Sequence, residues 1–275
     1  MADTEHLAIV QLGSNDALAG LALSAEAHWN QNEADWRFFL SKGTVFGVRN
    51  DDRHLIATAA LLPHASGNAW ISMVLVTASW RRRGLATRLV DACLDTATKL
   101  GLTTWLDATP AGANVYGPLG FTPTLQLRRL RLALSSPVQT GMKLSACNLI
   151  EFAARDRRAM GFDRGHLLSE LGERPGSRLL SNGGSTALVR DGRTARHLGP
   201  LFADDVESAL ALVDEIVRNE TRPVLIDAVA SQAEFINGLT NSGWIVERPF
   251  QRMRFGRATA QAEDLPFAVT GPEYG

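Results

Sequence analysis

The sequence is poor in several features that would mark particular classes of protein. Only two of its 275 residues are cysteine, Cys93 and Cys147, and they do not form a C-x-x-C pair. A disulfide framework and a thiolate-rich zinc site are therefore not expected, no metal site is predicted, and a reducing compartment fits. No apolar run approaches the roughly 20 residues that a membrane-spanning helix needs.

An excess of charge of one sign is also lacking. The 28 Lys and Arg residues nearly balance the 29 Asp and Glu residues, which gives a formal net charge of -1, so the sequence predicts no nucleic-acid partner. The opening residues carry Asp3 and Glu5 where a secretory signal would carry Lys or Arg. We expect a cytoplasmic protein with no membrane partner, present as a monomer or a homodimer.

The residues that are present predict helices and strands around a full core. Hydrophobic residues make up 45% and charged residues 21% of the chain, which is typical of a soluble globular protein. Apolar positions that recur every three or four residues between Leu85 and Lys99 predict a helix with one buried stripe, which includes Cys93. The other predictions for the first half are helical structure over 18–40, strands over 44–48, 55–62, 69–76, 102–108 and 125–134, and a short helix around Val115.

A second series of elements echoes the first, which predicts two copies of one fold. Leu106-Asp107-Ala108 and Ile226-Asp227-Ala228 lie 120 positions apart (227 − 107), and each is followed by a glycine–aromatic pair and a final apolar strand. A helix over 206–218 takes the place of the helix over 85–99. We place the first domain at 1–134, a linker at 135–145, the second domain at 146–258, and a tail at 259–275 that docks through its apolar run 265–269.

The segment between the strand that ends at Val76 and the helix that starts at Leu85 is the most informative one. It carries three consecutive arginines, Arg81 to Arg83, followed by Gly84. The unpaired N–H groups at a helix N-terminus favour an anion, and the arginines suit a diphosphate. A solvated surface loop is the alternative. The sequence lacks G-x-G-x-x-G and G-x-x-x-x-G-K-S/T, which disfavours nucleotide hydrolysis.

This segment resembles the acetyl-CoA signature of the GNAT superfamily of N-acetyltransferases. In that signature a strand ending in V-x-P precedes R/Q-x-x-G-x-G/A at the start of a helix. Arg81-x-x-Gly84-x-Ala86 matches it, with Ala78 in place of the proline, and the stretch 115–121 resembles the family's L-Y-x-x-x-G-F motif. The resemblance implies two tandem GNAT folds of the α/β (α+β) class, each with a mixed, mostly antiparallel twisted sheet flanked by helices.

The resemblance also implies where acetyl-CoA binds. The backbone of residues 74–76 would hold the pantetheine amides by strand pairing, and the N–H groups of residues 82–87 would hold the pyrophosphate. The backbone N–H near Val74 would stabilise the oxyanion of the tetrahedral intermediate. The full set of implied cofactor-binding residues is Val74, Leu75, Val76, Arg81, Arg82, Arg83, Gly84, Leu85, Ala86, Thr87 and Tyr116.

Tyr116 matches the family tyrosine that protonates the departing CoA thiolate, which a phenol with a pKa of about 10 can do while charge builds on sulfur. The alternative is a core tyrosine on a short helix. Many relatives have a glutamate that acts as the general base about four positions before the equivalent of Val76, but this sequence has Ser72 there. The candidate bases are His64, Asp107 and a water held by Ser72, and the base stays unassigned. His64 could instead be a surface histidine, and Asp107 a brace at a strand end.

The second half lacks the anion cradle. Asp204 and Asp205 stand where the arginines and the glycine would be, and their charges would repel a pyrophosphate. The resemblance implies a degenerate second half that completes the core or walls the acceptor pocket, and it assigns the segment 28–36 to the first helices, which shape that pocket. The leading function is acetyl-CoA-dependent N-acetylation of a primary amine on a small molecule or amino acid derivative. The alternatives are a protein or peptide N-acetyltransferase and a non-catalytic acyl-CoA sensor.

Overall fold

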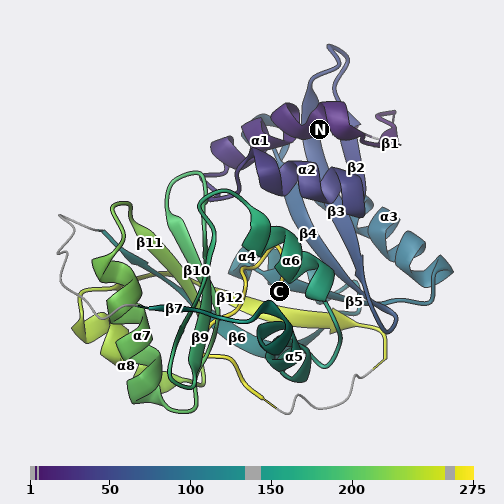
Figure 1. Ribbon diagram of the computed structural model, residues 1–275. Coiled ribbons are helices and arrows are strands. Elements are labelled where there is room, and N and C mark those ends of the chain that lie inside the picture. Colours follow the sequence, from purple (N-terminus) through teal and green to yellow (C-terminus); the bar gives the residue numbers. More distant parts are fainter. Residues whose placement is uncertain (1–3, 5, 134–143, 258–263) are drawn as a thin grey trace.

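Two similar series of helices and strands make up the computed structural model, which describes residues 4, 6–133, 144–257 and 264–275 (Figure 1). The helix predicted over 85–99 is confirmed, and its apolar stripe is buried, namely Leu85, Leu89, Val90, Cys93, Leu94 and Ala97. The first half contains β1 (Ile9–Gln11), α1 (Ala17–Glu26), α2 (Glu33–Lys42), β2 (Thr44–Arg49), β3 (Leu55–His64), β4 (Asn68–Val76), the short 3-10 helix η2 (Ala78–Trp80), α3 (Leu85–Lys99), β5 (Thr103–Ala108), α4 (Pro110–Tyr116) and β6 (Thr122–Leu132).

The second half repeats this order. The helix predicted over 206–218 is confirmed with the same bounds. The elements are β7 (Ser145–Ala146), α5 (Leu149–Met160), α6 (Gly165–Glu173), β8 (Arg178–Asn182), β9 (Ser185–Arg190), β10 (Arg196–Phe202), α7 (Val206–Arg218), β11 (Val224–Val229), α8 (Ala233–Asn241) and β12 (Ile245–Phe255). Among the described residues, no helix has the length and apolar character to cross a membrane.

The boundaries at 1–134, 135–145, 146–258 and 259–275 stay a prediction. Most of the predicted linker and the start of the predicted tail lie outside the described residues, which leave out 134–143 and 258–263.

The helical run predicted over 18–40 is two helices, which corrects the sequence reading. α1 ends before His28, whose φ of 56° lies in the left-handed region. α2 begins after Asn32, which accepts a hydrogen bond from the Asp35 N–H while the Asp35 carboxylate accepts one from the Asn32 N–H. This capping box starts a new helix. The connecting residues reach the second half, where Asn30 Nδ2 donates to the Ala195 carbonyl at 3.1 Å.

One continuous sheet joins the two halves because their final strands change places. The strand order is β1-β2-β3-β4-β5-β12-β6-β11-β10-β9-β8-β7. β12 pairs with β5, and β6 pairs with both β12 and β11, all antiparallel (Figure 1). The last strand of each half therefore completes the sheet of the other half.

Two buried ion pairs occupy equivalent places beside the exchanged strands. Arg252 on β12 donates from Nε and Nη2 to Asp107 on β5, at 2.8 Å each. Arg129 on β6 donates from Nε and Nη2 to Asp227 on β11, at 2.8 and 2.7 Å. Both pairs are bidentate, a geometry that adds specificity to the attraction between the charges. Because removing one partner would leave a buried charge uncompensated, these pairs favour the observed register.

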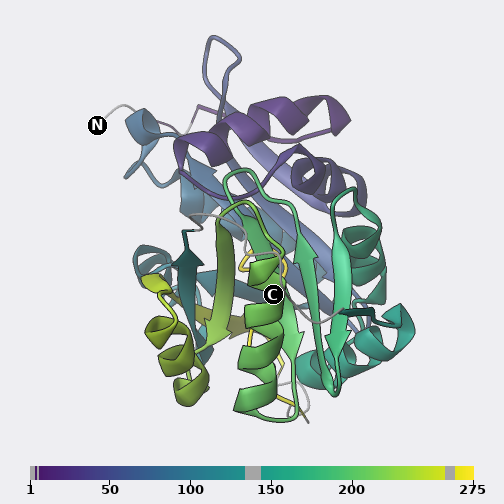
Figure 2. The same ribbon diagram turned by 60° about the vertical axis from the view of Figure 1, so that its left-hand side comes forward.

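Helices cover both faces of the first-half strands. Along β4, Ala69 and Ile71 belong to the core under α3, whereas Trp70 and Met73 belong to the core under α1 and α2. Strict alternation would put residues 70 and 73 on opposite faces, so the shared face of Trp70 and Met73 marks a bulge between them. In the second half, α7 packs on β8 and β9 (Figure 2, green helix in the foreground).

The tail lies between two strands of the second half. β10 and β11 pair in parallel at their starts, and beyond that point Ala268 bridges Leu201 of β10 on one side and Ala228 of β11 on the other. Residues 267–269 are all buried. The tail thus takes up backbone hydrogen-bonding groups that the diverging strands would otherwise leave unpaired.

Candidate active site

β4 and β5 diverge in the same way as β10 and β11. They pair in parallel only from Asn68 to Trp70 and from Thr103 to Trp105. We call the opening beyond these pairs the first notch, and the equivalent opening between β10 and β11 the second notch. Met73 has a φ of 52°, where the pairing of β4 with β3 changes register. A positive φ is costly for a residue with a side chain, and such strain clusters at functional sites.

The predicted anion cradle follows directly after β4. Arg82 and Gly84 have φ values of 61° and 79°, so the chain curls before α3 starts at Leu85. In the part of the chain that the structure describes, the backbone N–H groups of residues 82–87 donate no hydrogen bond, and no side chain caps α3. The first turn of α3 carries no acidic residue. The arrangement is a nest of unpaired donors at the positive end of a helix, which favours an anion.

Two of the three arginines brace the cradle. Arg81 Nε donates to the Val76 carbonyl at 3.0 Å, and Arg83 Nη2 donates to the Ser79 carbonyl at 3.0 Å. Arg83 also lies over the ring of Trp80, 4.7 Å from its centroid. Arg82 is exposed. The cradle is therefore fixed by its own loop and keeps a solvent-facing guanidinium beside the free N–H groups.

A cavity of about 90 Å³ lies at the first notch and is lined by both halves of the chain. Its walls include residues 71–74 of β4, the strand that leads to the cradle, and residues 106–108 of β5. The full lining consists of Trp29, Gln31, Ile71, Ser72, Met73, Val74, Leu106, Asp107, Ala108, Thr109, Tyr116, Arg129, Arg248, Phe250, Pro272 and Glu273.

Tyr116 ends α4 and stands in the cavity wall. It is largely buried against Phe121, with ring centroids 5.9 Å apart. Burial raises the pKa of Tyr116 to about 12, and neighbouring Cys93 adds to this. The phenol therefore keeps its proton at neutral pH, as a proton donor must.

The three candidate bases differ in their access to the cavity. Ser72 lines it and is buried. Asp107 also lines it, but Arg252 takes both of its carboxylate oxygens; burial raises the pKa of Asp107, and the Arg252 charge opposes this. His64 is buried rather than exposed and is absent from the lining. Burial, with Arg164 and His166, lowers its pKa to about 3.

Several cavity residues escape the sequence reasoning. Arg129, Arg248 and Phe250 come from the exchanged strands, and Glu273 comes from the tail. Glu273 is more than 120 positions from every first-half residue of the lining, and no motif surrounds it. The sequence does predict a docked tail and a repeated fold. Neither prediction says which half each final strand joins, and therefore which residues of the strands and tail line the cavity.

The second notch differs in both of its parts. Asp205 caps α7 by accepting a hydrogen bond from the Ser208 N–H at 2.7 Å, and backbone donors lower the pKa of Asp205. Asp204 pairs with Arg155 at 3.1 Å. Residues 267–269 of the tail fill the space between the strands. An anion would be repelled there by the carboxylates of Asp204 and Asp205. A ligand that pairs with a strand edge would find the edge already occupied by the tail.

Known proteins resemble this chain over most of its length. Residues 16–121 match the acetyltransferase (GNAT) family, and residues 153–268 match an acetyltransferase (GNAT) domain. The chain is 22% identical over 247 residues to an uncharacterised N-acetyltransferase of Bacillus subtilis strain 168, YitH, covering 86% of this chain and 87% of that protein.

Solved structures share the fold. A proposed acetyltransferase from Pyrococcus horikoshii has a TM-score of 0.81 at 18% identity, covering 98% of this chain and 96% of that one. A tandem GNAT protein from the clavulanic acid biosynthesis pathway has a TM-score of 0.65 at 17% identity, covering 92% and 100%. One acetyltransferase domain is thus matched in each half, and the chain belongs to the GNAT family of acetyltransferases as a tandem member.

Proposed function

We propose that the first half binds acetyl-CoA and transfers its acetyl group to the primary amine of a small molecule. The observation that carries this proposal is the free cradle: the N–H groups of residues 82–87 have no protein acceptor among the described residues. They follow β4, the strand whose residues 71–74 line the cavity with Tyr116. An anion site, an open strand edge and a protonated phenol therefore lie along one path.

Acetyl-CoA fits this path. A pyrophosphate takes hydrogen bonds from clustered N–H groups at a helix N-terminus, and residues 82–87 with Arg81 to Arg83 would supply them. A pantetheine arm pairs with a free strand edge, and residues 74–76 lie where β4 has left β5. When bound, acetyl-CoA would supply the acetyl thioester on which an amine acts.

Two groups of the chain would assist the transfer. The backbone N–H at Val74, one residue past the strained Met73, would face the carbonyl oxygen and stabilise negative charge there. Tyr116 would hold its proton toward the sulfur and release it as the bond to carbon weakens. Because the pKa of Tyr116 is raised, the phenol stays protonated across the neutral pH range.

A small acceptor suits the cavity better than a folded protein. The space is about 90 Å³ and is closed by residues of both halves, including Arg129 and Arg248 of the exchanged strands and Pro272 and Glu273 of the tail. A cavity with walls on several sides admits a compact amine, whereas a protein segment needs an open groove.

Thiol release tests this function. The purified chain is titrated with acetyl-CoA by calorimetry, and free CoA is measured with a set of primary amines that includes tyramine, cadaverine, glucosamine, L-lysine and L-tyrosine. We expect binding and amine-dependent release. Tyr116→Phe should lower kcat about 100-fold with an unchanged Kd for acetyl-CoA. Binding without release by any amine would favour an acyl-CoA sensor, and absence of binding would contradict the proposal.

A further inference from the structure

Three buried oxygen atoms at the cavity have no hydrogen-bond partner in the part of the chain that the structure describes. They are Oε1 of Gln31, Oγ of Ser72 and Oε2 of Glu273, and all three residues line the same cavity. A buried acceptor without a donor is unfavourable. A primary ammonium group carries three N–H donors and no acceptor, so it complements this set.

We propose that Glu273, together with Ser72 and Gln31, binds the ammonium group of the acceptor, and that Glu273 Oε2 accepts its proton. This inference rests on the proposed acetyl transfer and assigns the base that the sequence leaves open. It gives Ser72 a binding role in place of the glutamate that many relatives carry at that position. The carboxylate comes instead from the far end of the chain.

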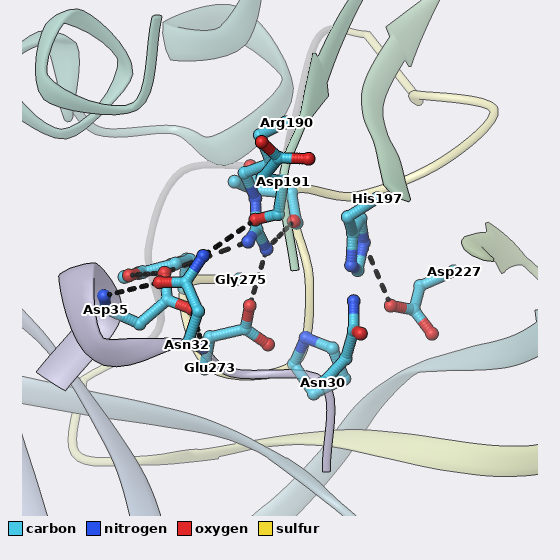
Figure 3. A network of polar contacts seen from close by, with 12 residues as sticks. Asn30, Asn32, Asp35, Arg190, Asp191, His197, Asp227, Glu273 and Gly275 are labelled. Carbon is cyan, nitrogen blue, oxygen red and sulfur yellow. Dashed lines mark hydrogen bonds and ion pairs between the residues drawn. The ribbon is translucent and has the colours of Figure 1, made fainter. Parts of the chain in front are cut away.

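Glu273 is held so that one of its oxygens stays available. Arg190 Nη2 on β9 donates to Glu273 Oε1 at 2.5 Å, and the two side chains are 2% and 3% exposed (Figure 3). Asp35 of α2 lies 3.8 Å from Arg190 on the other side. Gly271 makes room for the carboxylate, because a Cβ there would lie 2.9 Å from both Glu273 oxygens. The arginine thus orients Oε1 and leaves Oε2 for a ligand.

Contacts with both halves fix the tail around Glu273. Trp70 Nε1 on β4 donates to the Pro272 carbonyl at 3.0 Å, two residues before Ser72. The Tyr274 hydroxyl donates to Asp35 Oδ1 at 2.8 Å, and Arg164 Nη1 donates to the Tyr274 carbonyl at 2.8 Å. Residues 267–269 lie in the second notch, and these further contacts hold the following residues so that the Glu273 carboxylate reaches the cavity at the first notch.

Apart from Arg248, the other charged groups near the cavity are already engaged. Both oxygens of Asp107 bind Arg252, and Arg129 binds Asp227. Arg190 and Asp35 engage each other and the tail. Glu273 is the one cavity-lining carboxylate in the described structure that keeps an oxygen without a partner.

The proposed step balances. Glu273 takes one proton from the ammonium, and the nitrogen lone pair forms the N–C bond as the C–S bond breaks. Sulfur takes a proton from Tyr116. The nitrogen loses a second proton when the amide forms, which restores the Tyr116 phenol, and Glu273 returns its proton to solvent. One proton is released for each amine acetylated.

Glu273→Gln tests the assignment because it keeps the shape of the side chain. With the most active amine of the set, we expect kcat/KM at pH 7 to fall at least 100-fold while the Kd for acetyl-CoA stays unchanged. The proposal attributes the decrease of kcat/KM at acidic pH, the acidic fall, to protonation of the base. This decrease should therefore disappear in the variant. Ser72→Ala should raise KM for the amine about tenfold. A merely structural Glu273 would leave the acidic fall in place.

Matched substitutions provide the controls. Glu220 is a buried glutamate that pairs with Arg196, and Ser185 is a buried serine whose Oγ has no hydrogen-bond partner among the described residues. Neither residue lines the cavity. Glu220→Gln and Ser185→Ala should keep native kinetics. If Glu273→Gln does not fold, Glu273→Asp should still lose at least tenfold in kcat, since the carboxylate is displaced by about one bond. Native turnover in either Glu273 variant overturns the proposal, whereas lack of turnover by the native chain contradicts the proposed function instead.

Arg248 carries a second, independent inference about the acceptor. It lines the cavity from β12. Within the described residues it forms no ion pair, and its Nε has no partner. It lies over the Phe250 ring, 5.5 Å from the ring centroid. Burial and the Arg129 guanidinium lower the pKa of Arg248, and the charges of Glu247 and Asp227 oppose this. An anion beside it would relieve both effects.

We propose that Arg248 binds a carboxylate of the acceptor, which makes the substrate class an amino acid rather than a plain amine. The test compares L-lysine with cadaverine and L-tyrosine with tyramine, since each pair differs only by the carboxylate. The native chain should prefer the amino acid at least tenfold in kcat/KM, and Arg248→Met should abolish the preference. Arg131→Met, which alters an arginine paired with Glu247 outside the cavity, should keep it. A native chain without the preference in either pair contradicts the proposal.

Discussion

The two notches of the sheet have the same architecture and opposite contents. In each, two parallel strands pair at their starts and then diverge, and a helix follows the first of them. The first notch has a cavity and is followed by a cradle whose N–H groups have no acceptor within the described part of the chain. The second notch has aspartates at the helix start and a segment of the chain's own tail between the strands.

The difference shows that a diverging strand pair can be completed in two ways. Backbone groups at an open edge need hydrogen-bond partners, and these come either from a ligand or from the protein itself. In the second half the tail supplies them through Ala268 and its neighbours. The half with aspartates at the start of its helix is the half whose strands are bridged by the chain's own tail. The predictions below alter one notch at a time, from the largest expected effect to the smallest.

The two buried ion pairs test whether the strand exchange is symmetrical. Asp107→Asn and Asp227→Asn each leave a buried arginine uncompensated, so each should lower the free energy of unfolding by about 3–5 kcal/mol, measured by urea denaturation. Glu33→Gln, in an exposed pair with Arg37, should cost less than about 1 kcal/mol. A loss at only one of the two aspartates would show that the halves are held differently.

Phe267→Ala tests the closure of the second notch. Phe267 is 5% exposed and packs on Phe235, with ring centroids 5.1 Å apart. Its truncation should lower the free energy of unfolding by about 3 kcal/mol, and it should reduce amine acetylation because the same segment carries Glu273. The Kd for acetyl-CoA should stay native. Leu265→Ala, at a 42% exposed position, should change stability by less than about 0.5 kcal/mol.

Ala86→Glu tests the anion cradle by making the first notch resemble the second. An acidic side chain in the first turn of α3 would repel a pyrophosphate. The Kd for acetyl-CoA, measured by calorimetry, should rise at least 100-fold, or about 2.7 kcal/mol. Thr98→Glu makes the same change of charge at an exposed position near the other end of α3 and should leave the Kd unchanged. Equal affinity in both variants would rule out the cradle as the binding site.

Each half buries a histidine whose pKa is lowered by its burial, His64 in the first half and His197 in the second. Neither ring nitrogen of His64 has a hydrogen-bond partner among the described residues, whereas Nε2 of His197 lies 3.3 Å from an Asp227 carboxylate oxygen. The folded pKa of His64, about 3, lies below the unfolded value of 6.5, so the unfolded chain binds the proton first. The free energy of unfolding should fall by about 1.4 kcal/mol for each pH unit between pH 6.5 and about pH 3. His64→Leu should reduce this slope, the exposed His54→Asn should not, and an unchanged slope in His64→Leu would contradict the assignment.

The parts of the structure that the sequence predicts are local. The helix over 85–99 follows from periodicity within 15 residues, and the candidate cradle is a contiguous segment between a strand and that helix. Short-range patterns report backbone conformation because neighbouring residues impose it. The break at His28 was missed because a left-handed residue without glycine leaves little signal.

The strand exchange could not be read from the sequence. β6 and β12 have the same length and the same order of buried and exposed residues. Each carries an arginine, Arg129 or Arg252, that suits Asp107 and Asp227 equally. Local physics therefore cannot say which sheet each strand completes. The tail posed the same difficulty, since Trp70 and Pro272 meet across 202 positions of sequence.

The most direct test of the contrast between the notches is the stoichiometry of CoA binding. Calorimetry of the full chain with CoA should give one molecule per chain, with Ala86→Glu abolishing the heat. Two molecules per chain would mean that the tail leaves the second notch to a ligand. No binding by a folded native chain would contradict both the assignment of residues 82–87 as the CoA site and the proposed acetyl transfer.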